Sequence, residues 1–484
     1  MKAQVLLPKI FNFPFTYFSK SKSKIGNLVV VPFGSKKEIG VIWKNNYSNP
    51  KNIKIKDIYN ETKYSIDRKM VDFIEWFSSY NMVPIGLVLK MVIGGSDKFV
   101  KIKDDSFKIK KTKKKNYTLN EEQIKALNFL EKANAKFDVS VLQGTTGSGK
   151  TLVYFERIKK IIESQKQALV LLPEIFLTND FKSRFEDFFG FEPAIWHSKI
   201  TPKQKRIIWK GLINNQVKIL IGARSALLLP FKKLGIIIVD EEHDASYKQD
   251  ERVIYNARDM AISRAYFEKV PIHLITSVPS LETYNNIQNK KYRHTKILKR
   301  FNDFPLPKAK IINLNLKKIK SNFISNEAID MVKQHLKKGD QVLFFINRRG
   351  FAPYLICKKC GTKEICPNCS LYLTFHKLKN KAICHHCSFE KKIQSKCKSQ
   401  SNCEYIMYGP GVEKIFEEAK EIFPDKNISI FSSDYLKKKN ETKILFKNIR
   451  ENKVDILVGT QMISKGFNFP KLNCIVVIDA DFSG

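Results

Sequence analysis

Gly144-Thr145-Thr146-Gly147-Ser148-Gly149-Lys150-Thr151 is the stretch that decides the fold of this 484-residue chain. The apolar run 139–142 before it predicts a buried strand, and residues 152–162 after it predict a helix. A strand, a glycine-rich turn and a helix in this order are typical of a phosphate-binding loop. The glycines let backbone N–H groups turn toward phosphate oxygens, and the helix presents its positive end to the same anion.

The loop predicts ATP and Mg²⁺ as ligands. We expect all eight residues of 144–151 to contact the nucleotide. Lys150 can reach the outer phosphates, and the Thr151 hydroxyl can ligate Mg²⁺.

A second apolar run, 236–239, ends in Asp240-Glu241-Glu242-His243. A carboxylate at the carboxyl end of a parallel strand, beside a phosphate loop, is placed to hold Mg²⁺ through water. We therefore predict that Asp240 positions the metal. Glu241 is then placed to orient and deprotonate the attacking water. Together with Lys150, these two carboxylates form the predicted catalytic set.

The bulk composition limits the class of protein. Lys and Arg total 86 against 47 Asp and Glu, a formal net charge of +39. Such an excess predicts a polyanionic partner, most simply nucleic acid, although the abundance of Lys, Ile, Asn and Phe is also what an A+T-biased genome would encode. The sequence has no apolar run near the ~20 residues that span a bilayer, and its start does not resemble a signal peptide. We expect a cytoplasmic protein.

Eight of the nine cysteines fall between residues 357 and 403, and six of them form three C-x-x-C pairs. In an intracellular chain this clustering favours metal over disulfides, because two thiolates two residues apart can hold one edge of a tetrahedral Zn²⁺. The spacing therefore predicts two Cys₄ zinc sites but does not show which pairs combine. His376, His385 and His386 are alternative ligands. The predicted ligands are Cys357, Cys360, Cys366, Cys369, Cys384, Cys387, Cys397 and Cys403.

The first hundred residues read as a small β-rich module. Strands are predicted at 4–7, 15–18, 28–31 and 40–43, and residues 65–79 place apolar side chains on one helical face. The lysine-rich segment 104–115 that follows is predicted to be a linker, with contact to a phosphate backbone as the alternative.

Residues 117–123 open the next helix. Asn120 and Gln123 have the spacing of a capping box. A Gln side-chain amide can also pair with both edge groups of adenine, and the two roles of Gln123 are compatible.

Short apolar strands then alternate with helical stretches in two series. The first has strands at 168–172, 217–221, 236–239 and 272–275, and the second at 341–346, 428–431, 454–458 and 474–478. This alternation predicts an α/β fold with two lobes of the RecA type, the first binding ATP. Residues at or near strand ends are candidates for contact with a nucleic-acid phosphate, namely Arg224, Ser225, Arg348, Arg349 and Lys465.

These motifs together resemble the PriA family of bacterial replication-restart helicases, which belong to helicase superfamily 2. The matching stretches in the first half are VVVPFGSKKEIGVIW (29–43), YTLNEEQ (117–123), GTTGSGKT (144–151), LLPEIFLT (171–178), IGARSALLLP (221–230) and VDEEHDASYKQ (239–249). In the second half they are FINRRGFAP (345–353), the cysteine block, GPGVEKI (409–415) and ILVGTQMISKGFNFP (456–470).

The resemblance implies a domain plan. Residues 1–103 would bind the 3′ end of a DNA strand, 104–115 would be a basic linker, 116–300 the ATP-binding lobe, and 301–484 a second lobe with its zinc-binding insertion at 357–403. It also implies that His243, Tyr247 and Tyr255 couple DNA binding to hydrolysis.

The resemblance also implies a zinc pairing. Cys357, Cys360, Cys397 and Cys403 would share one zinc, and Cys366, Cys369, Cys384 and Cys387 the other.

The chain departs from the family pattern in several places. The family's winged-helix domain has no counterpart between the N-terminal module and the ATPase, and Gln400 stands where the family's last zinc ligand is expected. The family's G-S-A-T-P-S-L-E reads I-T-S-V-P-S-L-E at 275–282, which places Val278 at the Thr position. The sequence stops before the family's arginine-bearing motif, from which we expect weak ATP hydrolysis.

The favoured hypothesis is an ATP-dependent 3′-to-5′ DNA helicase that recognises stalled or abandoned forks and initiates primosome assembly. By resemblance, its partners would be branched and single-stranded DNA, other primosome proteins and single-strand-binding protein. The main alternative is a non-catalytic scaffold that binds fork DNA. An RNA-acting ATPase is a third hypothesis, and it would require contacts to the 2′-OH.

Overall fold

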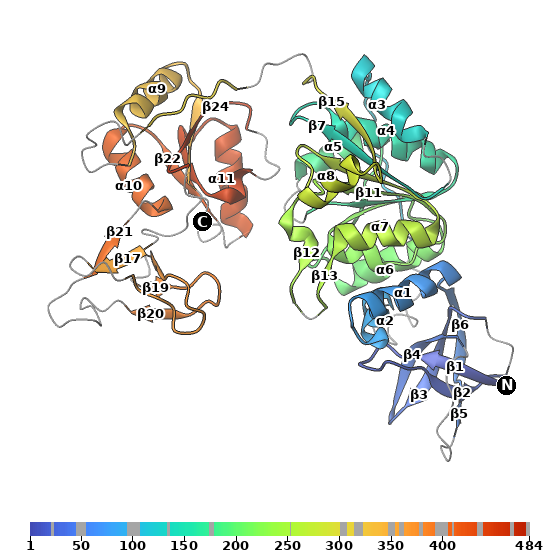
Figure 1. Cartoon of the computed structure of the whole chain (residues 1–484). Coiled ribbons are helices and arrows are strands. Elements are labelled where there is room, and N and C mark those ends of the chain that lie inside the picture. Colours follow the sequence, from blue (N-terminus) through green and yellow to red (C-terminus); the bar gives the residue numbers. More distant parts are fainter. Residues whose placement is uncertain are drawn as a thin grey trace. The chain divides into compact units, whose positions relative to one another are not determined.

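The computed structural model divides the chain into two units, Met1–Leu306 and Pro307–Gly484, which are shown in Figure 1. None of the helices in the described part of the chain is both long and apolar enough to cross a membrane. The structure describes residues 1–20, 24–44, 55–93, 107–132, 136–173, 179–251, 253–300, 307–313, 323–346, 354–357, 363–376, 381–392, 405–408, 411–432, 439–464 and 469–480.

The chain begins with a six-stranded sheet of order β5-β2-β1-β4-β3-β6, in which every pairing except β2 with β5 is antiparallel. This sheet confirms the predicted β-rich module. The strands are β1 (Lys2–Leu6), β2 (Phe15–Phe18), β3 (Asn27–Phe33), β4 (Lys36–Ile42), β5 (Lys56–Asp57) and β6 (Asn60–Ser65). Alternate residues of β3 and β4 enter two different apolar clusters, as the two-residue period of a strand requires.

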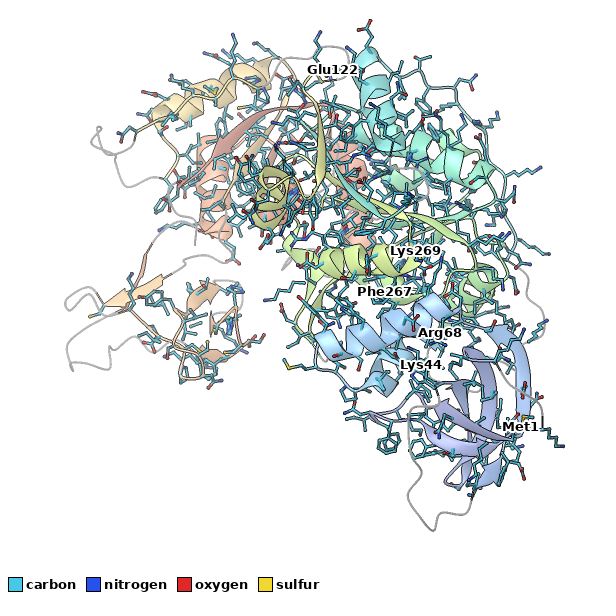
Figure 2. All side chains as sticks on the ribbon, turned by 45° about the vertical axis from the view of Figure 1, so that its right-hand side comes forward. Met1, Lys44, Arg68, Glu122, Phe267 and Lys269 are labelled. Carbon is cyan, nitrogen blue, oxygen red and sulfur yellow. The ribbon has the colours of Figure 1, made fainter. Side chains whose placement is uncertain are left out.

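Two helices, α1 (Arg68–Tyr80) and α2 (Ile85–Ile93), join this sheet to the following domain. Helix α1 contacts α7 (Ala257–Glu268), and Figure 2 shows Arg68 of α1 and Phe267 of α7 on neighbouring helices. The ring of Phe73 lies 6.0 Å from that of Phe267, and the Trp209 indole N–H donates to the Val92 carbonyl at 2.8 Å. The module therefore shares one apolar core with the domain that follows.

The second domain of this unit is a seven-stranded parallel sheet of order β15-β7-β14-β11-β8-β10-β9. Sequence reasoning predicted five of its strands and missed β9 and β15. The strands are β7 (Asp138–Gly144), β8 (Gln167–Leu171), β9 (Ala194–Trp196), β10 (Ile219–Gly222), β11 (Leu234–Asp240), β14 (Pro271–Thr276) and β15 (Arg293–Ile297).

Helices cover both faces of this sheet, which explains why its central strands are apolar without interruption. Ile236 and Ile238 of β11 join the cluster that contains α3, α4 and α5, whereas Ile237 and Val239 join the cluster that contains α6 and α7. The covering helices are α3 (Glu121–Glu131), α4 (Lys150–Glu163), α5 (Asn179–Phe189) and α6 (Pro202–Ile213), with α8 (Leu281–Gln288) following β14.

The register of the sheet brings three strand ends together. Asp240 of β11 pairs with Ile275 of β14, and Thr276 of β14 pairs with Gln143 of β7. Because all three strands run in the same direction, the phosphate loop after β7, Thr276 and the carboxylates after β11 all lie at one edge. This edge is where the candidate site is found.

The described part of the predicted linker, 107–115, is hydrogen-bonded to the ATPase domain. The Thr112 N–H donates to Gly190 O at 2.9 Å, the Glu192 N–H donates to Lys110 O at 2.9 Å, and Lys115 pairs with Asp187 at 2.8 Å. Phe107 and Ile109 line a cavity of about 260 Å³ against Ile162. These backbone bonds attach the segment along the residues after α5.

The second unit contains a four-stranded parallel sheet of order β22-β23-β16-β24. Helices α9 and α10 cover one face, and α11 covers the other. Its elements are α9 (Asn326–Lys337), β16 (Gln341–Phe345), α10 (Val412–Ile422), β22 (Ile428–Phe431), α11 (Lys439–Arg450), β23 (Ile456–Gly459) and β24 (Leu472–Val477). The four predicted strands are thereby confirmed, and the two sheets establish the predicted α/β class.

The cysteine block lies between β16 and α10 as a set of short strands. The pair β17 (Tyr354–Cys357) and β21 (Tyr405–Tyr408) brackets it, and β18 (Thr374–His376), β19 (Lys381–Ile383) and β20 (Glu390–Lys392) form a small antiparallel sheet.

Replacing Phe77 by Ala should destabilise the first unit. Phe77 is fully buried in α1, and its ring meets that of Tyr255 at 5.3 Å, so truncation leaves a cavity between the module and the ATPase domain. We expect a loss of about 3–5 kcal/mol, read from urea unfolding. Tyr80→Ala on the same helix is the control, because Tyr80 is 64% exposed, and it should cost far less. Equal losses would contradict this account of the interface.

Candidate active site and metal centre

The glycine-rich loop closes around a lysine, as the motif predicts. Lys150 begins α4, and its Nζ donates to the carbonyl oxygen of Gly144 at 2.7 Å and to that of Thr145 at 3.3 Å. Gly149 has φ +79°, and a Cβ there would stand 2.3 Å from Nε2 of Gln123. A side chain at residue 149 is therefore excluded by the backbone conformation and by the space available.

Two polar atoms of the loop fit a bound nucleotide. The hydroxyls of Thr145 and Ser148 are buried without a hydrogen-bond partner. Buried hydroxyls are normally satisfied, so these two, at the N-terminus of α4, suit the phosphate oxygens of a bound ligand. These two buried hydroxyls are therefore evidence, independent of the motif, that residues 144–151 fit ATP.

Gln123 is fully buried, and both ends of its amide are engaged. Its Oε1 accepts from the Asn120 N–H at 3.0 Å, and its Nε2 donates to the Ser148 carbonyl at 3.0 Å. The predicted capping box is confirmed, since the Gln123 N–H also donates to Asn120 Oδ1 at 2.9 Å. Adenine recognition by Gln123 stays a prediction, and it would require the amide to exchange a protein partner for the base.

Asp240 and Glu241 lie close enough to Lys150 to alter its titration. Burial lowers the pKa of Lys150, while Glu241 and Asp240 act in the opposite direction. Burial and the charge of Glu241 raise the pKa of Asp240 to about 6. Burial likewise raises the pKa of Glu241, and Lys150 opposes this. The three predicted catalytic residues therefore form one electrostatic cluster.

Sequence reasoning missed a tyrosine beneath this cluster. The hydroxyl of Tyr154, fully buried in α4, donates to Asp240 Oδ2 at 2.9 Å. Thr151 lies one helical turn earlier on α4, and its side chain opposes the rise in the pKa of Tyr154. Tyr154 therefore lies beside both residues predicted to hold Mg²⁺. Its spacing of three residues from Thr151 was the available signal.

Two of the three residues predicted to couple DNA binding to hydrolysis contact the same strand ends. His243 Nδ1 lies 2.8 Å from the hydroxyl of Thr276. The hydroxyl of Tyr247 lies 2.6 Å from the carbonyl oxygen of Asp240 and 2.9 Å from that of Leu171. The family's Thr is replaced by Val278, but Thr276 supplies a hydroxyl to His243 from two residues earlier.

Glu242 is a second feature that sequence reasoning did not assign. Its side chain is completely buried and accepts from the Ser280 N–H at 2.8 Å and from the Thr283 hydroxyl at 2.9 Å. Arg258 of α7 lies 3.3 Å from the same carboxylate and donates to the Ser280 hydroxyl at 2.6 Å. Glu242 thereby ties the carboxylate motif to residues 280–283 and to α7.

The predicted DNA contacts are only partly described. Arg224 donates to the carbonyl oxygen of Lys248, which lies in the coupling segment, residues 243–255. Ser225 is exposed. Tyr255 is buried against Phe77 and not exposed for DNA. Arg348, Arg349 and Lys465 lie outside the described residues.

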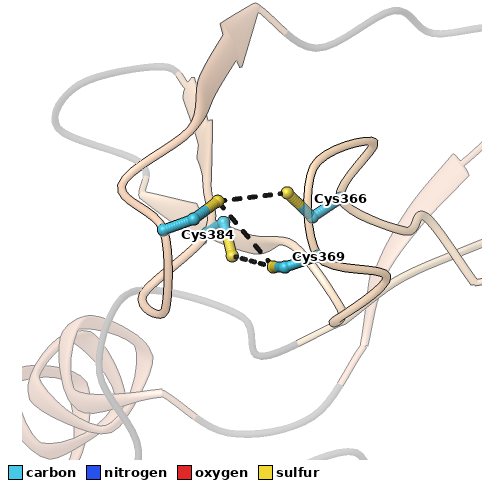
Figure 3. A group of neighbouring side chains, drawn as sticks. Cys366, Cys369 and Cys384 are labelled. Atoms are coloured by element: carbon cyan, nitrogen blue, oxygen red, sulfur yellow. Dashed lines mark hydrogen bonds between the residues drawn. The ribbon is translucent and has the colours of Figure 1, made fainter.

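Four cysteines in the second unit are grouped so that they could hold one metal ion, as Figure 3 shows. The sulfurs of Cys366 and Cys387 are 3.4 Å apart, as are those of Cys369 and Cys384, and all four lie within 4.8 Å of one another. Four thiolates at about 2.3 Å from a tetrahedral Zn²⁺ have sulfurs roughly 3.8 Å apart, so this set fits zinc.

The two cysteine turns are built alike. The Ser370 N–H donates to Cys366 O at 3.0 Å, and the Ser388 N–H donates to Cys384 O at 2.9 Å. Ser370 and Ser388 both have φ near +60°. Each turn thereby aims two sulfurs at the same point. His376 and His385 are 2.9 Å apart through their Nε2 atoms and are not needed to complete this set.

Of the other predicted set, only Cys357 is described, buried at the end of β17. Cys360, Cys397 and Cys403 lie outside the described residues.

Family patterns match three parts of the chain. The DEAD/DEAH box helicase pattern covers residues 120–286, a 3′ DNA-binding domain pattern covers 4–94, and the pattern of the PriA DNA helicase Cys-rich region covers 366–392. With the sheet, the phosphate loop and the four-cysteine centre, these matches define an ATP-dependent DNA helicase that carries a zinc module.

Curated relatives are similar over most of the chain. The replication restart protein PriA of Rickettsia felis is 40% identical over 99% of this chain and 74% of its own length. The PriA protein of Haemophilus influenzae is 39% identical over 75% of this chain and 50% of its own length. The PriA protein of Bacillus subtilis is 34% identical over 71% of this chain and 43% of its own length. The chain belongs to the PriA family of replication restart proteins.

Asp240→Asn should stabilise the metal-free and nucleotide-free protein at neutral pH. The pKa of Asp240 is raised from 3.8 to about 6. The stability that its proton supplies is therefore complete below pH 3.8 and is lost as the pH rises through 6. Asparagine carries no charge, so its advantage over the parent should grow by up to about 3 kcal/mol between pH 4 and 7.

Urea unfolding at a series of pH values measures this difference. Asp250→Asn is the matched control, because Asp250 is exposed and its removal should give a small difference that changes little with pH. An Asp240→Asn effect that is the same at every pH would show that burial of the charge is not its cause.

Proposed function

We propose that this helicase translocates 3′ to 5′ along DNA and opens stalled or abandoned replication forks. Residues 4–94 would bind the 3′ end of a strand, and ATP hydrolysis would take place at the loop 144–151. The proposal is carried by one observation, which is the cluster of Lys150, Asp240 and Glu241 at the carboxyl edge of a parallel sheet.

Each residue of the cluster has a role that its surroundings support. Lys150, freed from the Gly144 carbonyl, would bind the outer phosphates, and the hydroxyls of Thr145 and Ser148 would gain phosphate partners. Thr151 and Asp240 would hold Mg²⁺, which when bound neutralises developing phosphate charge. Glu241 would accept a proton from the attacking water. Its raised pKa makes the carboxylate a stronger base than an ordinary glutamate.

The packing of the first unit supports communication between DNA and nucleotide. Tyr247 and His243 contact the strand ends that carry the active site, and Arg224 contacts the same coupling segment. Tyr255 lies against Phe77 of the N-terminal module. DNA bound at Arg224 or at the module could therefore alter the position of Asp240 through direct contacts.

Further parts of the function rest on the family. Arg348, Arg349 and Lys465 would contact DNA from the second lobe, and the domain plan 1–103, 104–115, 116–300 and 301–484 would apply. Other primosome proteins and single-strand-binding protein would be partners, with the work done in the cytoplasm. A second zinc would be held by Cys357 with Cys360, Cys397 and Cys403. In its support, Cys357 pairs with Tyr405, which follows Cys403 by two positions in the chain.

Lys150→Ala should abolish both ATP hydrolysis and strand separation on forked DNA, with DNA binding retained. ATPase rate and fork unwinding should each fall at least about 100-fold, because the phosphates lose their charged partner within the loop. Lys166→Ala, an exposed lysine after α4, is the control and should leave both rates unchanged. If Lys150→Ala separates strands like the parent, the non-catalytic scaffold is the better hypothesis.

Zinc content should be two per chain, measured by mass spectrometry of the purified protein. Cys384→Ser should leave one zinc, and so should Cys357→Ser, because each breaks a different set. Cys474→Ser is the control, since Cys474 is buried in β24, away from the cysteine block, and this variant should keep both. The second site would be contradicted if the parent protein held one zinc and the Cys357→Ser variant still held that zinc.

A further inference from the structure

The segment that follows β15, residues 298–300, contacts the nucleotide loop through Arg300. The Nε–H of Arg300 donates to the carbonyl oxygen of Thr146 at 3.0 Å. A Cβ placed on Gly147 would be 3.4 Å from Nε and 3.5 Å from Nη2 of Arg300. The guanidinium therefore covers the tip of the loop, at residues 146 and 147, where any side chain would meet it.

The same segment is also attached to α3. The carboxylate of Glu122 accepts from the backbone N–H groups of Leu298 and Lys299, both at 3.0 Å. Figure 2 shows Glu122 at the start of that helix. The next residue, Gln123, donates to the Ser148 carbonyl. Residues 298–300 are thus attached both to α3 and to the nucleotide loop itself. No motif in the sequence indicated this attachment.

The position of Arg300 suits a charged ligand better than the peptide group that it contacts. Arg300 is half-buried, and the oxygen of Thr146 is neutral. A phosphate would add the attraction of an opposite charge, and a guanidinium can hold a phosphate through two parallel N–H bonds. Lys150, the other cation at the loop, donates to the carbonyl oxygens of Gly144 and Thr145. The two cations therefore contact three successive carbonyl groups of the loop, those of residues 144, 145 and 146.

We propose that Arg300 is a second cationic ligand for the phosphates of the nucleotide bound at this loop. The proposal deepens the proposed function, since it assumes that ATP binds at residues 144–151. Arg300 would exchange the Thr146 carbonyl for a phosphate oxygen, while Glu122 keeps the backbone of 298–299 in place.

Nucleotide affinity of the full chain provides the test, without any need for turnover. Fluorescent derivatives of AMP, ADP and a non-hydrolysable triphosphate are titrated, with Mg²⁺, into the parent and into four variants. Arg300→Ala removes the cation, Arg300→Lys keeps the charge, and Glu122→Gln weakens the attachment of the segment. Lys291→Ala, an exposed lysine before β15, is the matched charge control.

Arg300→Ala should weaken triphosphate binding about ten-fold, weaken ADP binding less, and leave AMP binding unchanged. Arg300→Lys should recover part of the loss, and Lys291→Ala should bind all three ligands like the parent. Glu122→Gln should have a smaller effect than Arg300→Ala, because the guanidinium remains. Thermal unfolding of each variant checks that the lobe is intact.

Three results would overturn the proposal while leaving the nucleotide site in place. Equal loss for AMP and the triphosphate would place Arg300 on the base or sugar. Equal loss for Glu122→Gln and Arg300→Ala would make the segment a structural attachment only. No loss in Arg300→Ala, with binding abolished in Lys150→Ala, would exclude Arg300 while the nucleotide site stands. If the parent itself binds no triphosphate, the proposed function fails along with this inference.

Discussion

A lysine and two carboxylates, held together where burial disfavours all of their charges, organise the first unit. Burial lowers the pKa of Lys150 and raises those of Asp240 and Glu241, so each group depends on the opposite charge beside it. Such an arrangement is costly without ligands and becomes favourable when phosphate and metal charges enter. The parallel sheet makes the arrangement possible, because its register places the ends of β7, β14 and β11 side by side.

Helix α7 connects this cluster to the rest of the unit. Arg258 reaches the buried Glu242, and Arg264 donates to the carbonyl oxygens of Leu227 and Leu229, in the stretch that begins with Arg224. The same helix packs against α1 of the N-terminal module. A displacement of α7 would therefore reach the carboxylate motif, the strand-end residues and the DNA-binding module through direct contacts. Packed elements of this kind transmit displacement because their cores resist gradual deformation.

The zinc module obtains its stability in another way. Its apolar cluster is small, with Leu355, Leu373 and Phe375 among its few members, and two of its four thiolates are buried in that cluster. A core of this size does not support a fold without a crosslink, so metal binding supplies much of the folding free energy. The two Cys-x-x-Cys-Ser turns need only local hydrogen bonds to aim their sulfurs, which makes each pair readable from its spacing. The spacing did not show that these two pairs combine.

Local pattern in the sequence determined the strand–loop–helix at 138–163, the capping box at Asn120, the Cys-x-x-Cys pairs and the class of both sheets. Each depends on residues close together in the chain or on the regular periods of strands and helices. Contacts between distant residues appear only in the tertiary structure. Tyr154 beneath Asp240, Arg258 on Glu242 and Arg300 on Thr146 join residues 16 to 154 positions apart. The order of strands in the sheet decides which of these meet, and no local pattern encodes that order.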